Sequence, residues 1–277
     1  MKNGNQELSQ EQLDRIRSFT LMHDEFMSAV FENNTEAATL VIRIILERND
    51  IEVVKISTQK VMSNIYGHSV RLDMLAVDSG NRLYNIEIQR QDKGPGYRRA
   101  RYYSSLIDAH VLEAGADYSK LADTYVIFIT EKDYLGRGKP IYHIDRTVKE
   151  TGLDFSDGTH IIYVNGTIID ESTSLGRLMH DFHCTDSADM HYEQLAERTR
   201  DLKETEGGRA HMSIIVEEYG NERYAEGLAE GINTTAVNML KRNYSVEVVS
   251  ECTGLSTEQV QELAAKIKEN SDNCKTA

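Results

Sequence analysis

Apolar side chains in the first fifty residues recur at the spacing of α-helices. Phe19 and Phe26 begin one such stripe, which continues to Phe31, and Thr20 is a candidate cap for this helix. A second helix is predicted from about Thr35 to Glu47, again with its apolar residues on one face. The N-terminal part of the chain is therefore expected to be helical.

From residue 53 the apolar period changes to two, which is typical of β-strands. The strand candidates are residues 53–57, 60–65, 70–77, 82–90, 125–130, 141–144 and 160–164. The run Tyr125–Thr130 is apolar almost throughout and indicates a central strand covered on both faces. Asp78-Ser79-Gly80-Asn81 is dense in turn formers, so the strands on either side of it should form a hairpin. A helix is predicted from Tyr97 to about Glu113, and its expected buried stripe is Ala100, Tyr103, Ile107 and Val111.

After about Glu171 the pattern is helical only, which predicts a division into residues 15–170 and a helical region of residues 171–277. The predicted helices are residues 175–182, 192–204 and 212–241, followed by a pair within 245–267. That pair resembles a helix-turn-helix, with Ser256 capping its second helix, although a plain packing unit is the simpler interpretation. Gly227 and Gly231 interrupt the long helix, which indicates either a kinked exposed helix or close approach of a partner helix.

The composition excludes several classes of protein. No run reaches the roughly 18 apolar residues of a membrane helix, and the first twenty residues lack the profile of a signal peptide. The three cysteines lie far apart, so no disulfide framework is indicated, and a reducing, cytoplasmic location is expected. The net charge of −14 argues against attraction of the whole chain to nucleic acid, but it leaves room for a local basic patch.

The predicted hairpin carries two carboxylates on one face. If its paired residues have numbers that sum to 160, Asp73 lies opposite Glu87, and Cβ atoms of such pairs are only ~4.5–5.5 Å apart. Two carboxylates at that distance repel each other, and a divalent cation such as Mg²⁺ or Mn²⁺ would remove the conflict. The alternative is that both acids face solvent or pair with a nearby arginine, for which the candidates are Arg71, Arg82 and Arg90.

The order of several motifs resembles the PD-(D/E)XK nuclease superfamily, and specifically its recombination-promoting nuclease/putative transposase (Rpn) family. The motifs in order are His23-Asp24-Glu25-Phe26, Arg71-Leu72-Asp73, Asn85-Ile86-Glu87-Ile88-Gln89, Arg98 to Ser105, Tyr125 to Thr130, Ala225 to Ile232 and Thr253-Gly254-Leu255-Ser256. Together they span roughly residues 20–270. The resemblance implies an α/β restriction-endonuclease-like core, with a mixed central sheet flanked by helices, and a helical C-terminal tail. The sequence departs from the superfamily pattern at Gln89, where the name of the superfamily expects lysine.

Carried onto this chain, the resemblance implies a metal-dependent endonuclease that hydrolyses DNA phosphodiester bonds and is linked to recombination or transposition. Asp73, Glu87 and the backbone carbonyl of Ile88 would bind Mg²⁺ or Mn²⁺, and Gln89 would orient the attacking water. A third acid is expected from the N-terminal helix. Asp24 is the best match by position, and Glu25 and Glu36 are its rivals.

A basic strip lies beside this acidic site in the sequence. Between Arg90 and Arg101 there are five basic residues and one acidic residue, so the segment has a net charge of +4 within an acidic chain. Helical spacing places Arg98, Arg101 and Tyr102 near one face, which fits either contact with DNA phosphates or a solvated, salt-bridged surface. The resemblance to a nuclease family favours the phosphate contact. A homodimer through the C-terminal helices is also expected, since their apolar stripe would be exposed in a monomer.

Two other interpretations remain open. One is a catalytically degenerate member that binds DNA or protein without cutting, because Gln89 cannot supply a positive charge. The other is a helical interaction protein that acts through its tail. A further cluster, His180, His183, Cys184 and His191, contains residue types that bind zinc. It has no second cysteine at ligand spacing, so packing at a helix end is the simpler interpretation.

Overall fold

The computed structural model describes residues 8–64, 69–90 and 96–273, and the chain divides into two compact units. The first unit is Met1–Ile215 and the second is Val216–Ala277. The first unit is built on a six-stranded sheet whose order is β1-β2-β3-β4-β6-β5. The strands are β1 (Val53–Met62), β2 (Val70–Asp78), β3 (Leu83–Gln89), β4 (Thr124–Thr130), β5 (Ile141–Ile144) and β6 (Thr159–Asn165).

The sheet is mixed, as expected. β1, β2 and β3 are antiparallel, β3, β4 and β6 are parallel, and β5 is antiparallel to β6. Helix α4 (Tyr97–Val111) connects β3 to β4, because two parallel neighbours need a crossover. Every residue of β4 is buried, so the apolar run Tyr125–Thr130 correctly predicted a central strand. The predicted α/β architecture is confirmed.

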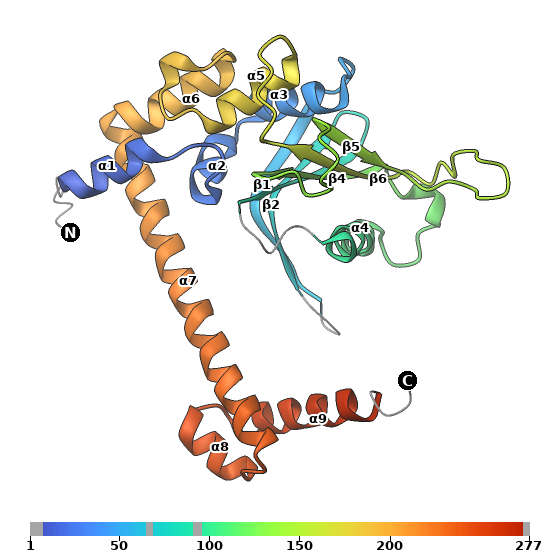
Figure 1. Ribbon diagram of the computed structural model, residues 1–277, viewed down its shortest axis with the longest axis vertical. Coiled ribbons are helices and arrows are strands. Elements are labelled where there is room, and N and C mark those ends of the chain that lie inside the picture. Colours follow the sequence, from blue (N-terminus) through green and yellow to red (C-terminus); the bar gives the residue numbers. More distant parts are fainter. Residues whose placement is uncertain (1–7, 65–68, 91–95, 274–277) are drawn as a thin grey trace. The chain divides into compact units, whose positions relative to one another are not determined.

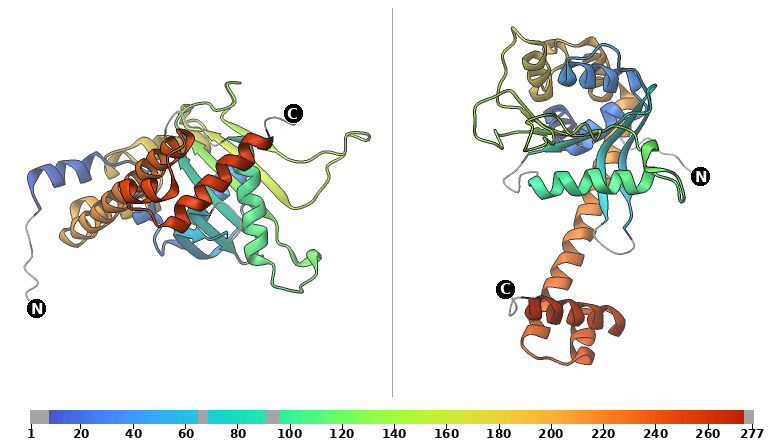
Figure 2. Two further views of the ribbon diagram at one scale, coloured as in Figure 1. Left: turned by 90° about the horizontal axis from the view of Figure 1, so that it is seen from below. Right: turned by 90° about the vertical axis from the view of Figure 1, so that its right-hand side faces the viewer.

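Helices cover both faces of this sheet (Figures 1 and 2). α2 (Asp24–Phe31) and α3 (Thr35–Leu46) pack against β1 and β2 on one face, and α4 covers the other. A core between α4 and the sheet joins Leu72 and Leu75 to Tyr103, Ile107 and Phe128. α4 thereby packs mainly over β4, and its side chains also reach those of β2.

Three details differ from the sequence prediction. The first helix α1 (Gln10–Ser18) ends before Phe19, and α2 begins only at Asp24, because the Thr20 hydroxyl and the His23 ring fold the connection into a turn. Residues 53–62 form one strand rather than two, with Gln59 at φ +51° inside it. Val111 is 39% exposed, because α4 ends there and the chain turns away. Residue 65, the predicted end of the second strand, lies outside the described residues.

The first unit extends well beyond residue 170. Helices α5 (Ser174–His183) and α6 (Glu193–Glu204), with the 3-10 turns η1 (Tyr118–Lys120) and η2 (Ser187–Asp189), complete it. α5 packs against α3, and α6 packs against both α2 and α3. The buried ammonium group of Lys203 donates hydrogen bonds to the carbonyls of Arg17, Phe19 and Thr185. The division between compact units therefore lies later than the predicted boundary, because α5 and α6 bury their apolar faces on the N-terminal helices.

The second unit is a small helical cluster. Helix α7 (Glu206–Lys241) crosses the boundary between the units, and its end packs with α8 (Val246–Thr253) and α9 (Thr257–Asn273) around Ala236, Val249 and Val260. Gly254, at φ +73°, ends α8, and Ser256 and Gln259 form the reciprocal cap of α9. Among the described residues, no helix combines the length and the apolar character that crossing a bilayer requires.

Candidate metal centre at the end of the hairpin

The hairpin has the predicted register. Its paired residues, from Val77–Leu83 to Met74–Ile86, have numbers that sum to 160. The next pair in this register is Asp73 and Glu87, and there the carboxylates replace the ladder hydrogen bonds. The Asp73 backbone N–H donates to Glu87 Oε1 at 3.2 Å, and the Ile88 N–H donates to Asp73 Oδ2 at 3.0 Å. Each carboxylate is thus held by the backbone of the opposite strand.

Burial and neighbouring negative charge both raise the pKa of the carboxyl groups of Asp73 and Glu87. Glu87 is completely buried, and burial together with the charge of Asp73 raises its pKa well above the usual value. Burial, followed by the charge of Asp24, raises the pKa of Asp73 to about 7. Asp24 stands at the first position of α2, which packs against β2, so its carboxylate belongs to the same electrostatic neighbourhood. A cation at this point would relieve the repulsion among the three acids.

Among the described residues, Arg99 forms an ion pair with Glu87 at this site. Its Nη2 lies 3.2 Å from Glu87 Oε2, and its Nη1 donates to Gln89 Oε1 at 3.1 Å. Its Nε donates to the Tyr103 hydroxyl at 2.8 Å, and the guanidinium lies over the rings of Tyr103 and Phe128. Because Tyr103 and Phe128 belong to the core beneath α4, the guanidinium is held on a rigid platform.

Gln89 is positioned by its neighbours on both sides of its amide. Its Oε1 accepts the bond from Arg99, and its Nε2 donates to the backbone carbonyl of Ile88 at 2.9 Å. That carbonyl keeps a second lone pair, so it can still take part in binding a cation. Gln89 therefore links the Arg99 guanidinium to the Ile88 carbonyl, which the family resemblance implies as a ligand.

The predicted basic strip and the site residue Arg99 lie on different sides of α4. Arg98 and Arg101 are exposed, and the Tyr102 hydroxyl accepts a hydrogen bond from Asn64 at 2.9 Å. Arg99 was not predicted as a site residue, because helical spacing was used to select the residues of the solvent-exposed face of α4. Arg99 lies four residues before Tyr103, which belongs to the predicted buried stripe, and this spacing indicates that Arg99 faces the sheet. Lys93, part of the same basic segment, lies outside the described residues.

The rivals of Asp24 lie in different surroundings. Glu36 lies in the first turn of α3 (Thr35–Leu46) and lines a hollow of about 510 Å³ with Arg43 and Glu52, between α3 and the start of β1. Glu25 follows Asp24 in α2, and the charges of both acids act on His23, the residue that precedes that helix. The N-terminal acid whose charge acts on Asp73 is therefore Asp24.

Comparison with known proteins agrees with this geometry. A match to the family described as PD-(D/E)XK nuclease family transposase covers residues 29–174, more than half of the chain. The matched segment contains the whole sheet, α4 and the hairpin with Asp73 and Glu87. No curated protein matches the chain, and no solved structure does. The predicted resemblance to the PD-(D/E)XK superfamily is confirmed, and the chain belongs to the PD-(D/E)XK nuclease family of transposases.

Proposed function

We propose that this protein is a divalent-metal-dependent endonuclease that hydrolyses DNA phosphodiester bonds. The observation that carries the proposal is the meeting of Asp73 and Glu87, both with raised pKa, at the point where the β2–β3 ladder ends. PD-(D/E)XK nucleases generally use divalent metals. Asp73, Glu87 and the carbonyl of Ile88 would hold Mg²⁺ or Mn²⁺, since hard oxygen ligands suit both ions. Asp24 would be the third acid, acting from α2.

In this proposal, the protein's own groups hold and orient the reactants. A bound divalent cation would supply positive charge to a phosphoryl oxygen and lower the pKa of a water molecule. Gln89 would orient that water through its amide, which Arg99 and the Ile88 carbonyl hold in place. Uncharged Gln89 cannot supply the positive charge of the usual lysine. Arg99 would supply it instead, because its guanidinium contacts both Gln89 and Glu87.

DNA would lie across the exposed side of α4. Arg98 and Arg101 are exposed on the helix whose other side carries Arg99 into the metal site, so they would hold DNA phosphates on the solvent side of α4. The homodimer would form through the C-terminal helices. Within α7, Tyr224 is 74% exposed and Leu228 is 53% exposed. A Cβ atom added at Gly227 or Gly231 would meet no atom of the described chain within 4 Å, which leaves room for a second helix.

The second candidate is a member of the family that binds DNA or protein without cutting it. It is favoured by the ion pair between Arg99 and Glu87, because a guanidinium that neutralises the buried carboxylate does part of what a metal ion would do. The two candidates differ in one respect: a nuclease must bind a divalent cation at Asp73 and Glu87, and a degenerate member need not.

Plasmid cleavage separates the two candidates. Purified protein should convert supercoiled plasmid to nicked and linear forms with Mg²⁺ or Mn²⁺ and not with EDTA. Asp73→Asn and Glu87→Gln should each abolish this activity, whereas the exposed control Asp14→Asn in α1 should retain it. Cleavage by the Asp73→Asn, Glu87→Gln double variant at the wild-type rate would refute the assignment of the site. DNA binding without cleavage or metal binding would identify the degenerate member.

A further inference from the structure

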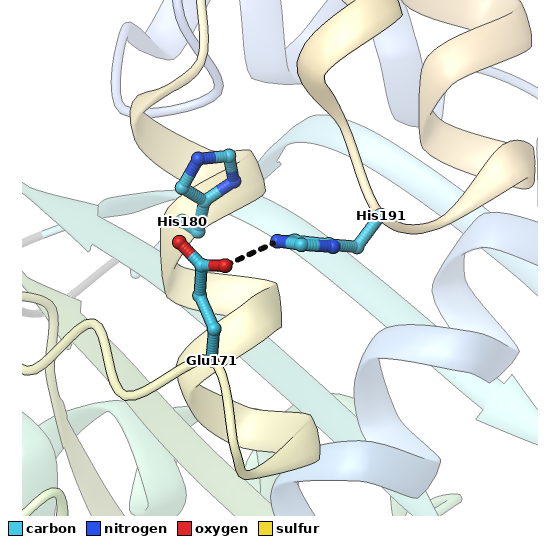
Figure 3. A group of neighbouring side chains, drawn as sticks. All are labelled: Glu171, His180 and His191. Carbon is cyan, nitrogen blue, oxygen red and sulfur yellow. Dashed lines mark ion pairs between the residues drawn. The ribbon is translucent and has the colours of Figure 1, made fainter.

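A second group of ligand-type side chains lies outside the hairpin site, where α5 and α6 meet. Glu171 precedes α5, His180 lies within α5, and His191 lies in the segment between η2 and α6. Figure 3 shows the Glu171 carboxylate beside both imidazole rings. Each side chain offers a ligand atom, and these three atoms all lie within 4.8 Å of one another. Residues from three separate segments thus converge on one point.

The spacing of these groups suits a shared ion better than a hydrogen bond. His191 Nε2 lies 3.6 Å from Glu171 Oε2, and the centroids of the two imidazole rings are 4.7 Å apart. The separation of 3.6 Å is that of the ion pair drawn in Figure 3 and is too long for a hydrogen bond. Ligand atoms that are ~2.0–2.2 Å from a tetrahedral zinc ion lie roughly 3.4 Å from each other. A small inward movement of the side chains would therefore bring them to coordination distance.

A buried carboxylate holds the histidines in place. Asp181, which is completely buried, accepts hydrogen bonds from the backbone N–H groups of His191 at 2.8 Å and Tyr192 at 2.9 Å. Its Oδ1 also lies 3.4 Å from His180 Nδ1. A carboxylate behind a metal-binding histidine orients the ring and selects its tautomer. Asp181 thus fixes the backbone of one histidine and faces the ring of the other.

We propose that Glu171, His180 and His191 form a binding site for a transition-metal ion, with Zn²⁺ as the expected occupant. Imidazole ligands select Zn²⁺ over Mg²⁺, so this site and the oxygen-lined hairpin would bind different metals. Water would occupy the fourth position, because Glu171 and His191 are exposed. The ion would tie the segment before α5 and the η2–α6 connection to α5.

Cys184 defines the competing arrangement. Its Sγ lies 3.4 Å from His180 Nδ1, so His180, Asp181 and Cys184 also stand close together. In that group both oxygens of Asp181 already accept backbone hydrogen bonds, whereas Glu171 has its carboxylate directed toward the two rings. The exposed group is therefore the better ligand set.

The test is Zn²⁺ binding to the full-length protein, measured by competition with a chromophoric chelator and by thermal unfolding. The Asp73→Asn, Glu87→Gln variant is used as the background, so that the hairpin carboxylates do not contribute. We expect one equivalent of Zn²⁺ and a rise in Tm. Glu171→Gln and His191→Asn should each weaken binding by roughly 10–100-fold or more and remove the rise in Tm. The control His143→Asn, an exposed histidine of β5, should leave both unchanged.

Two results would overturn the proposal. Unchanged Zn²⁺ affinity in both Glu171→Gln and His191→Asn would show that these side chains do not bind the ion. Loss of binding in Cys184→Ser, with a thiolate charge-transfer band in the Co²⁺ spectrum of the parent protein, would move the site to the competing arrangement. Because Glu171 is exposed, Glu171→Gln should keep the metal-free Tm of its parent, which separates lost binding from lost folding.

Discussion

Arg99 Nη2 lies 3.2 Å from Oε2 of Glu87, a carboxylate with no exposed surface at the end of the hairpin. The same guanidinium donates to Gln89, the residue that stands where the superfamily pattern has lysine. Helix α4, which lies outside the hairpin in the sequence, thus supplies the Arg99 guanidinium as a positive charge beside Glu87 and Gln89. Arg99 therefore has two expected roles: it stabilises the metal-free protein by pairing with Glu87, and it supplies positive charge in the proposed cleavage reaction.

Arg99→Met should destabilise the metal-free protein by about 1–3 kcal/mol, because it leaves the buried Glu87 without its partner, although Arg99 is partly solvated and Glu87 can take up a proton. Mg²⁺ should then raise the Tm of the variant more than that of the wild type, since the ion replaces the lost charge. Cleavage should fall by roughly 10²–10³-fold and recover partly in Arg99→Lys. The control is Arg98→Met, an exposed neighbour on the same helix. Equal Mg²⁺-induced shifts in Arg99→Met and the wild type would contradict the role given to Arg99.

The raised pKa of Asp73 and Glu87 predicts how stability depends on pH without metal. A carboxyl group whose pKa is higher in the folded protein binds more protons there, so the free energy of unfolding falls as pH rises. For Asp73 this loss should begin above its unfolded pKa, ~3.9, and be complete above its folded pKa of about 7. Asp73→Asn should flatten this dependence and be more stable than wild type at pH 8, by a few kcal/mol at most. Urea unfolding in EDTA, at pH values between 5 and 8, measures this pH dependence of the free energy of unfolding. The control Asp14→Asn should show the same pH dependence as the wild type.

The basic strip on α4 predicts a change in the salt dependence of DNA binding. Each phosphate contact adds about 0.9 to the slope of log K against log salt on duplex DNA. Replacing both Arg98 and Arg101 with glutamine should therefore weaken binding and lower the slope by roughly 1.8. Fluorescence anisotropy over a series of salt concentrations measures this slope. Arg15→Gln with Arg17→Gln, in the exposed part of α1, provides a control of equal charge change. An unchanged slope in the α4 variant would place the DNA on another surface.

The boundary between the two compact units predicts where the tail can be removed. Deleting residues 216–277 should leave a folded protein that still cleaves DNA with metal and sediments as a smaller assembly, because the exposed stripe of α7 is gone. Deleting residues 207–277 should instead impair folding. Met212 is completely buried, and Gly208 packs against the backbone of Asp201 so closely that a Cβ atom there would lie 2.0 Å from a carbonyl oxygen. Retention of the same association state after the shorter deletion would refute assembly through the tail.

The register of the hairpin, the central strand and the helix ends of the tail could be read from the sequence, because local interactions determine them. The turn Asp78-Ser79-Gly80-Asn81 sets which residues face each other, and this places Asp73 opposite Glu87. Ser256 and Gln259 cap α9 through bonds that span only three residues. Period and turn chemistry were sufficient for these features.

The sequence could not show which arginine of α4 enters the site. Arg98, Arg99 and Arg101 are chemically equal, and the packing of Tyr103 and Ala100 against the sheet decides that Arg99 points toward Glu87. Likewise, α5 and α6 join the first unit because they bury apolar faces on α2 and α3, with Lys203 and Asp181 bonded to distant backbone groups. Local pattern determined the elements and the register of the carboxylates, whereas the burial of helix faces against the sheet and against each other decided which side chains meet.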